Sequence, residues 1–159
     1  MPEPFKYAIV ERERRFLLAA IPDGVTSTSV VADRYLTGTR LRLREIRHED
    51  GSVQRKLGQK VRLTDGPQAI AHTTIYLDDA EWELLTALPA TTLTKTRHIV
   101  ERDGWRLAID EHVDGALVAE IDDGGERSLP DWLDVIADVT DLEAWTGARI
   151  AVGLGQARS

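Results

Sequence analysis

Alternating apolar and polar positions divide most of this chain into short extended segments. The clearest run is 39–45, where Leu41 and Leu43 alternate with arginines. Because successive side chains of a β-strand point to opposite faces, this run predicts a strand with one apolar and one cationic face. The same periodicity, together with enrichment in β-branched residues, predicts strands over residues 7–17, 30–37, 52–60, 69–77, 93–101, 105–111 and 117–122.

Turn residues separate these predicted strands. Asp-Gly pairs at 50–51, 103–104 and 114–115 suit hairpins, since they tolerate the positive φ angles that such turns need. Residues 26–29 are polar and indicate a connection. Asp78 or Asp79 is expected to cap a short helix that stops before Pro89, and a helical tail is expected from about residue 129 to 150.

The order of these elements predicts a closed barrel. About eight strands follow one another, mostly as antiparallel hairpins, and no repeat or linker divides them. We therefore predict one α+β domain over residues 1–152, an antiparallel eight-stranded β-barrel with a few flanking helices, followed by a frayed tail at 153–159. Closure removes exposed strand edges, and eight strands leave a lumen just wide enough for one small ligand.

Charged residues on the predicted strands are segregated by sign. Each set shares one face of its strand: Glu11 and Glu13; Arg40, Arg42 and Arg44; Lys56 and Lys60; Lys95 and Arg97; Glu120 and Asp122. One interpretation is that each of these faces is the solvent-exposed side of a sheet. A solvated face usually mixes signs, however, because like charges opposite one another destabilise a sheet. If the leucines face outward, the arginines face inward and the barrel interior is charged.

Composition limits the classes of ligand and partner. The 159 residues carry a formal charge of −7, which argues against broad nucleic-acid binding, so an anionic ligand needs a local basic site. No apolar run is long enough to cross a membrane. The absence of cysteine fits a reducing compartment, and we expect a cytoplasmic monomer or homodimer. The four histidines show no metal-ligand spacing, so we expect surface or core roles for them.

A charged interior implies a particular ligand chemistry. Buried charges are costly unless they are paired or liganded. Carboxylates from separate strands suit a hard divalent cation such as Mg²⁺ or Mn²⁺, whereas arginine forks and lysines match phosphate oxygens. The pattern therefore predicts a polyphosphate together with its metal. No glycine-rich phosphate loop or nucleophile elbow is present.

The ordered charged motifs resemble those of the CYTH domain, also called the triphosphate tunnel metalloenzymes. E-R-E-R-R at 11–15 is similar to the ExExK signature of that family. The resemblance covers nearly the whole chain, through L-R-L-R, K-L-G-Q-K, T-K-T-R-H, A-E-I-D and P-D-W-L. It implies an antiparallel eight-stranded tunnel that binds a triphosphate with a divalent metal and cleaves or transfers phosphate.

The same resemblance implies a role for each charged position. Catalytic roles fall on Glu11, Glu13 and Lys95, and the Mg²⁺ or Mn²⁺ ligands on Glu11, Glu13, Glu120 and Asp122. Substrate would be held by Arg15, Arg40, Arg42, Arg44, Lys56, Lys60, Lys95, Arg97 and Arg106. Arg15 stands where the signature has lysine, and His72 and Thr74 stand where many members carry a glutamate.

Three functions are compatible with this resemblance. The leading expectation is a metal-dependent hydrolase of inorganic triphosphate or another short triphosphate compound. An adenylate cyclase of the same fold is one alternative, and it would need a site for the adenine base. A non-catalytic module that binds polyphosphate is the other.

Overall fold

The computed structural model describes residues 5–63, 69–122, 127–147 and 149–150. Residues 153–159, which were expected to fray, lie outside this set. The described elements are β1 (Ile9–Leu18), β2 (Val25–Leu36), β3 (Leu41–His48), β4 (Val53–Arg62), β5 (Ala69–Tyr76), α1 (Asp79–Thr86), β6 (Ala90–Arg102), β7 (Trp105–His112), β8 (Leu117–Asp122), β9 (Val135–Asp138) and a 3₁₀ turn, η1 (Glu143–Trp145).

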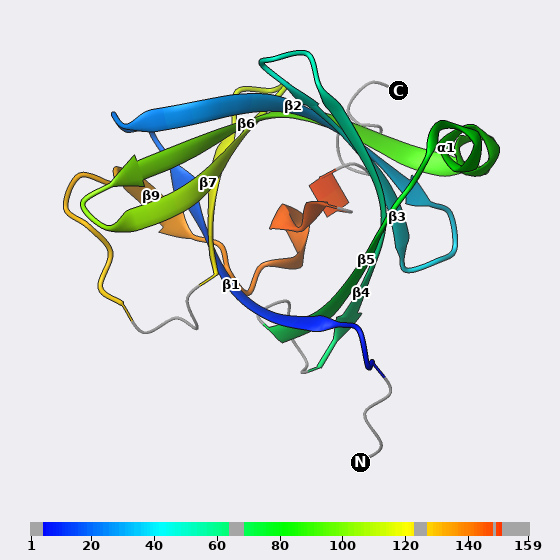
Figure 1. Cartoon of the computed structure of the whole chain (residues 1–159). Helices are drawn as coiled ribbons and strands as arrows, with labels where there is room; N and C mark the ends of the chain where they lie inside the picture. The colour runs from blue at the N-terminus through cyan, green and yellow to red at the C-terminus, as the bar shows by residue number, and fades with distance from the viewer. Residues whose placement is uncertain (1–4, 64–68, 123–126, 148, 151–159) are drawn as a thin grey trace.

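Eight of the strands form a closed antiparallel barrel, which confirms the predicted fold (Figure 1). Neighbouring strands follow the order β5, β4, β3, β2, β6, β7, β8 and β1. The ring closes where β1 pairs with β5, from Ile9 opposite His72 to Arg12 opposite Ala69. Backbone groups around the ring are thereby paired, and the lumen is enclosed on all sides by strands.

The ninth strand lies outside the ring and shows that the predicted helical tail at 129–150 is wrong over Val135–Asp138. Helical structure in this part of the described chain begins only at η1 and recurs at residues 147 and 149–150. Pairing between β1 and β5 ends at Arg12, so β5 does not cover the same edge of β1 beyond that residue. β9 pairs with that free stretch, with Phe16 opposite Asp138 and Leu18 opposite Val135. Unpaired strand edges favour strand addition, which explains why a V-I-A-D segment is extended here.

Residues 26–29, expected to form a connection, instead belong to β2. Thr28 pairs with His98 and Ser29 with Arg97 of β6, and Thr28 Oγ1 lies 3.2 Å from His98 Nδ1. Strand pairing here outweighs the polarity of the segment, because the strand tendency of a residue depends strongly on its cross-strand neighbours.

The main apolar cluster packs on the outer face of the barrel wall. Leu107, Ile109 and Val100 have no exposed surface, and the cluster includes Leu133 from the segment that precedes β9. The alternation along β7 and its neighbours is therefore apolar outward and charged inward. The barrel is stabilised from outside, which leaves the lumen free for polar chemistry.

Helix α1 also lies outside the barrel (Figure 1). Asp78 caps it with a full capping box, in which the Glu81 backbone N–H donates to Asp78 and the Glu81 side chain accepts from the Asp78 N–H. Arg55 of β4 forms an ion pair with Asp79, and Arg34 of β2 donates to the Thr86 carbonyl at 3.1 Å. Within the described residues, no helix is long and apolar enough to span a membrane.

We predict that Leu107→Ala lowers the free energy of unfolding by about 2–5 kcal/mol, since it opens a cavity in the outer cluster. Leu84→Ala on α1 is the matched control, because Leu84 is 75% exposed and Leu107 0%. It should change stability by less than about 0.5 kcal/mol. Urea unfolding of both variants measures the difference. Equal losses would contradict the burial of Leu107 in this cluster.

Candidate functional site

The barrel lumen contains a cavity of about 510 Å³, within the usual range for a small-molecule site. Nine cationic side chains and three carboxylates line it, in a chain whose net charge is −7. The cations are Arg15, Arg40, Arg42, Arg44, Lys56, Lys60, Arg62, Lys95 and Arg97, and the carboxylates are Glu11, Glu13 and Glu120. Positive charge is therefore concentrated inside an otherwise acidic protein.

All but two of the residues predicted for the site line this cavity. The exceptions are Arg106 and Asp122. The Arg106 side chain is 66% exposed, and its Nη1 lies 2.9 Å from Glu101 Oε1 near the start of β7. Asp122 is exposed at the end of β8, where its Oδ1 accepts from the Arg12 N–H at 2.9 Å. Both share a strand face with lumen residues but lie beyond the cavity.

Sequence reasoning missed other residues that the structure brings to the lumen. Arg62 continues the alternation of Lys56 and Lys60, so the pattern contained a signal for it. His72 was expected to have a surface or core role, yet it lines the cavity beside Glu11. His72 lies on β5 and Glu11 on β1, two strands that are far apart in the sequence, so the local pattern does not bring these residues together.

Asp33 of β2 fixes the orientation of Arg44. The two residues are directly opposite in the β2–β3 ladder, and Arg44 Nε and Nη2 donate to the two carboxylate oxygens at 2.7 and 2.8 Å. Asp33 is only 1% exposed. Burial opposes its ionisation, but the hydrogen bonds and charge of Arg44 hold the pKa of Asp33 below its usual value. The paired guanidinium is thus fixed at the cavity wall.

Asp110 of β7 serves two cations of β6 in the same way. Its Oδ2 lies 2.6 Å from Lys95 Nζ, and its Oδ1 accepts from Arg97 Nε at 2.7 Å. Despite burial, the charges of Lys95 and Arg97 hold the pKa of Asp110 far below its usual range. Arg97 Nη2 also reaches Glu120 Oε2 at 3.3 Å.

Arg42 differs from Arg44 and Arg97 because its charge is poorly compensated. Its side chain is 11% exposed, its Nε is buried with no hydrogen-bond partner, and that atom lies 3.9 Å from Asp33 Oδ1. Burial and then the charge of Arg44 lower the pKa of Arg42. A buried guanidinium with an unused donor at a cavity wall is costly without an anion.

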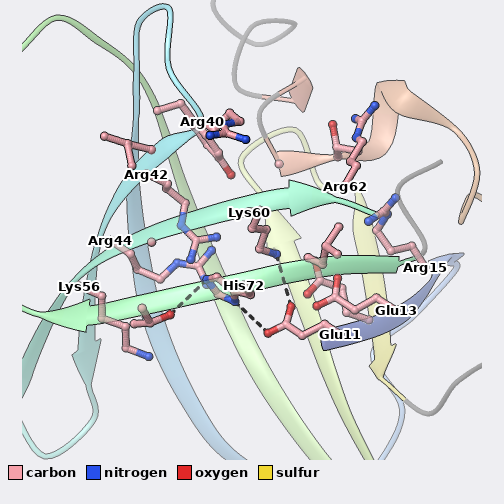
Figure 2. Close-up of a pocket in the computed structure, with 18 of the residues that line it drawn as sticks. Glu11, Glu13, Arg15, Arg40, Arg42, Arg44, Lys56, Lys60, Arg62 and His72 are labelled. Carbon is pink, nitrogen blue, oxygen red and sulfur yellow. Dashed lines mark hydrogen bonds and ion pairs between the residues drawn. The ribbon is translucent and has the colours of Figure 1, made fainter. Parts of the chain in front are cut away.

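The carboxylates face these cations from β1 and β8. His72 Nδ1 lies 2.8 Å from Glu11 Oε1, and Lys60 Nζ lies 3.9 Å from Glu11 Oε2 (Figure 2). Burial opposes ionisation of Glu11, but the contact with His72 lowers its pKa to about 2. Burial and then the charge of Glu120 raise the pKa of Glu13 to about 7.

Oxygen donors of this kind fit a hard divalent cation. Among the residues described, however, no three His, Cys, Asp or Glu side chains are arranged to hold a metal ion. Glu11 contacts His72 and Lys60 instead, yet its Oε2 is buried without a hydrogen-bond partner. A cation would relieve both this unused oxygen and the repulsion that raises the pKa of Glu13. The chemistry of these oxygens suits a divalent cation, whereas their present arrangement pairs Glu11 with His72 and Lys60.

Comparison with known proteins adds a fold relative. No model of a protein family matches the sequence, and no curated protein matches it. The crystal structure of the hypothetical protein NE1496 resembles this chain with a TM-score of 0.58 and 22% sequence identity, covering 89% of this chain and 97% of the other. At this identity the likeness shows a shared fold.

The raised pKa of Glu13 predicts how stability of the metal-free protein depends on pH. The folded state keeps the proton up to about pH 7, whereas the unfolded chain loses it near 4.5. Stability contributed by protonated Glu13 is therefore complete below pH 4.5 and is lost as the pH rises through about 7. Over this pH window the wild type should lose about 1–3 kcal/mol of its free energy of unfolding, and Glu13→Gln should abolish that loss.

Urea unfolding in chelator at both ends of that pH window provides the measurement. Glu13→Gln should be more stable than the wild type on the alkaline side and similar to it on the acid side. Glu83→Gln, an exposed position on α1, is the control and should follow the wild type. If the free energy of unfolding depends on pH equally in Glu13→Gln and in the wild type, Glu13 ionises normally.

Proposed function

We propose that the protein is a divalent-metal-dependent hydrolase of inorganic triphosphate or a short triphosphate compound, which binds in the barrel lumen. The observation that carries this proposal is Arg42, a buried guanidinium with an unused donor on a cavity wall that already holds many cations. Such a wall requires a ligand with several negative charges. The resemblance of the charged motifs to the CYTH domain supports the same conclusion.

The cationic wall would hold the phosphate chain. Asp33 and Asp110 each use two nitrogens of one arginine, which fixes the plane of the fork and leaves the remaining N–H groups of Arg44 and Arg97 for phosphate oxygens. Arg42 and Lys56 add donors on β3 and β4. The pKa of Lys56 is lowered by partial burial and then by the charges of Arg44 and Arg42, which an anion would neutralise.

The acidic wall would hold the metal. Glu11, Glu13 and Glu120 are its candidate ligands, and a divalent ion bound there supplies a Lewis acid for the phosphoryl group and a site for water. Lys95 Nζ, anchored by Asp110 at 2.6 Å, places a fixed positive charge within reach of Glu120. Preorganised charges of this kind stabilise the charge that develops on phosphoryl oxygens during transfer.

A substrate panel tests the proposal. Inorganic triphosphate, ATP, thiamine triphosphate and long polyphosphate are each incubated with Mg²⁺ or Mn²⁺, and released phosphate and cyclic AMP are measured. We expect orthophosphate from triphosphate. Cyclic AMP and pyrophosphate from ATP would identify a cyclase instead. Binding without turnover of any compound would identify a binding module.

We predict that Arg42→Ala reduces kcat/KM for triphosphate about 10- to 150-fold, the effect of losing about 1.5–3 kcal/mol from a charge-assisted hydrogen bond. Arg106→Ala is the control, because it removes the same charge from outside the cavity. Steady-state kinetics of both variants at several salt concentrations separate local contact from overall charge. Equal losses in the two variants would refute a specific role for Arg42.

We also predict that Glu13→Gln raises the metal concentration for half-maximal activity by about 10- to 100-fold, because fewer anionic oxygens bind a divalent ion more weakly. Asp122→Asn makes the same chemical change outside the cavity and should leave the metal requirement unchanged. Metal titrations at saturating triphosphate compare them. A shift in Asp122→Asn alone would place the metal at the end of β8 rather than in the lumen.

A further inference from the structure

The segment that follows β9 turns back into the barrel (Figure 1). It is anchored on β1, where Val139 N–H donates to the Arg15 carbonyl at 2.9 Å and Arg15 Nη2 donates to the Thr140 carbonyl at 2.9 Å. The Arg15 N–H also donates to Thr140 Oγ1 at 3.0 Å. These contacts are buried, so the segment starts from a fixed point on the barrel wall.

The segment then reaches the cavity itself. Thr146 and Gly147 are part of its lining, together with Thr39 and Arg40 at the turn between β2 and β3. In Figure 2 the segment lies on the same side of the cavity as Arg40 and away from Lys56. Backbone of the chain itself thus occupies the lumen at the β2–β3 end.

Gly147 fits only because it has no side chain. A Cβ at this position would lie 2.1 Å from the Tyr35 Oη and 3.3 Å from its Cζ. The φ angle of Gly147 is outside the left-handed region, so the need for glycine is steric. Tyr35 belongs to the lumen face of β2 and lines the cavity. The segment therefore lies directly against Tyr35 on the barrel wall.

We propose that residues 140–147 close the β2–β3 end of the lumen, so that a linear polyphosphate enters only by a chain end and is trimmed from that end. An eight-stranded barrel is just wide enough for one chain, so a lumen open at both ends would let a long chain pass through and be cut internally. This inference rests on the proposed function and specifies its substrate as the terminus of a linear polyphosphate.

The expected step is a hydrolysis. A water oxygen forms a bond to the terminal phosphorus while the bond from that phosphorus to the bridging oxygen breaks. The products are orthophosphate and a chain that is one unit shorter, and the proton lost by water goes to solvent. Internal cutting would consume the same water but would give two shorter chains.

The test follows the products of long linear polyphosphate on gels, with triphosphate hydrolysis measured on the same preparations. Gly147→Ala should displace the segment, because the new methyl group meets the Tyr35 hydroxyl. Adding Tyr35→Phe removes that hydroxyl and should let the segment return. A chain that ends at Asp141 keeps the contacts of Thr140 with Arg15 and provides a second way to open this end.

We expect the wild type to release orthophosphate from long chains without fragments of intermediate length. Gly147→Ala and the shortened chain should produce such fragments, and the Gly147→Ala, Tyr35→Phe double variant should not. Long chains left intact by the wild type, with triphosphate still hydrolysed, would contradict trimming from the chain end.

Other outcomes overturn the inference. Intermediate fragments from the wild type would show that both ends are open. Unchanged products in both opened variants, with triphosphate hydrolysis retained, would show that the segment does not control access. If the wild type hydrolyses neither triphosphate nor long polyphosphate, the proposed function is rejected and this inference is rejected with it.

Discussion

The cationic lumen depends on two aspartates buried in the barrel wall. Asp33 and Asp110 are each 1% exposed, and each meets an arginine on the neighbouring strand through two short hydrogen bonds. Without them, several like charges would face one another across a space too narrow for water to screen them well. The aspartates compensate part of this charge and hold the forks in one plane. The positive charge that the aspartates do not compensate, chiefly that of Arg42, is available to an anionic ligand.

The charged interior also determines where the protein obtains its stability. A barrel of this size usually fills its lumen with side chains, but here the main apolar cluster packs on the outside of the wall and needs a cover. The segment around Leu133 supplies it on the side of β1, β7 and β8. The same segment continues into β9 and then into the lumen. One stretch of chain therefore seals the core, completes the edge of β1 and limits access to the cavity.

The cavity lining brings groups of both charge signs together, and the proposed function depends on both. Cations on β3, β4 and β6 line the cavity together with carboxylates on β1 and β8. The contacts of Glu11 with His72 and Lys60 satisfy the acidic wall in part. His72 and Thr74 stand where the family resemblance leads one to expect a carboxylate, and both line the cavity.

The sequence by itself determined the strands, their hairpins and the sharing of charged faces, because strand periodicity and turn chemistry are local properties. It could not determine how far along the barrel each residue lies, which is why Arg106 and Asp122 were placed in a cavity that they do not reach. It also missed β9, since a strand that adds to a free edge is specified by its partner rather than by its own pattern. Only the tertiary structure decided that Asp33 meets Arg44, that His72 meets Glu11 and that Gly147 meets Tyr35. The first contact depends on the register of the β2–β3 hairpin, and the other two join parts of the chain that are far apart in sequence, so no periodicity within one strand encodes them.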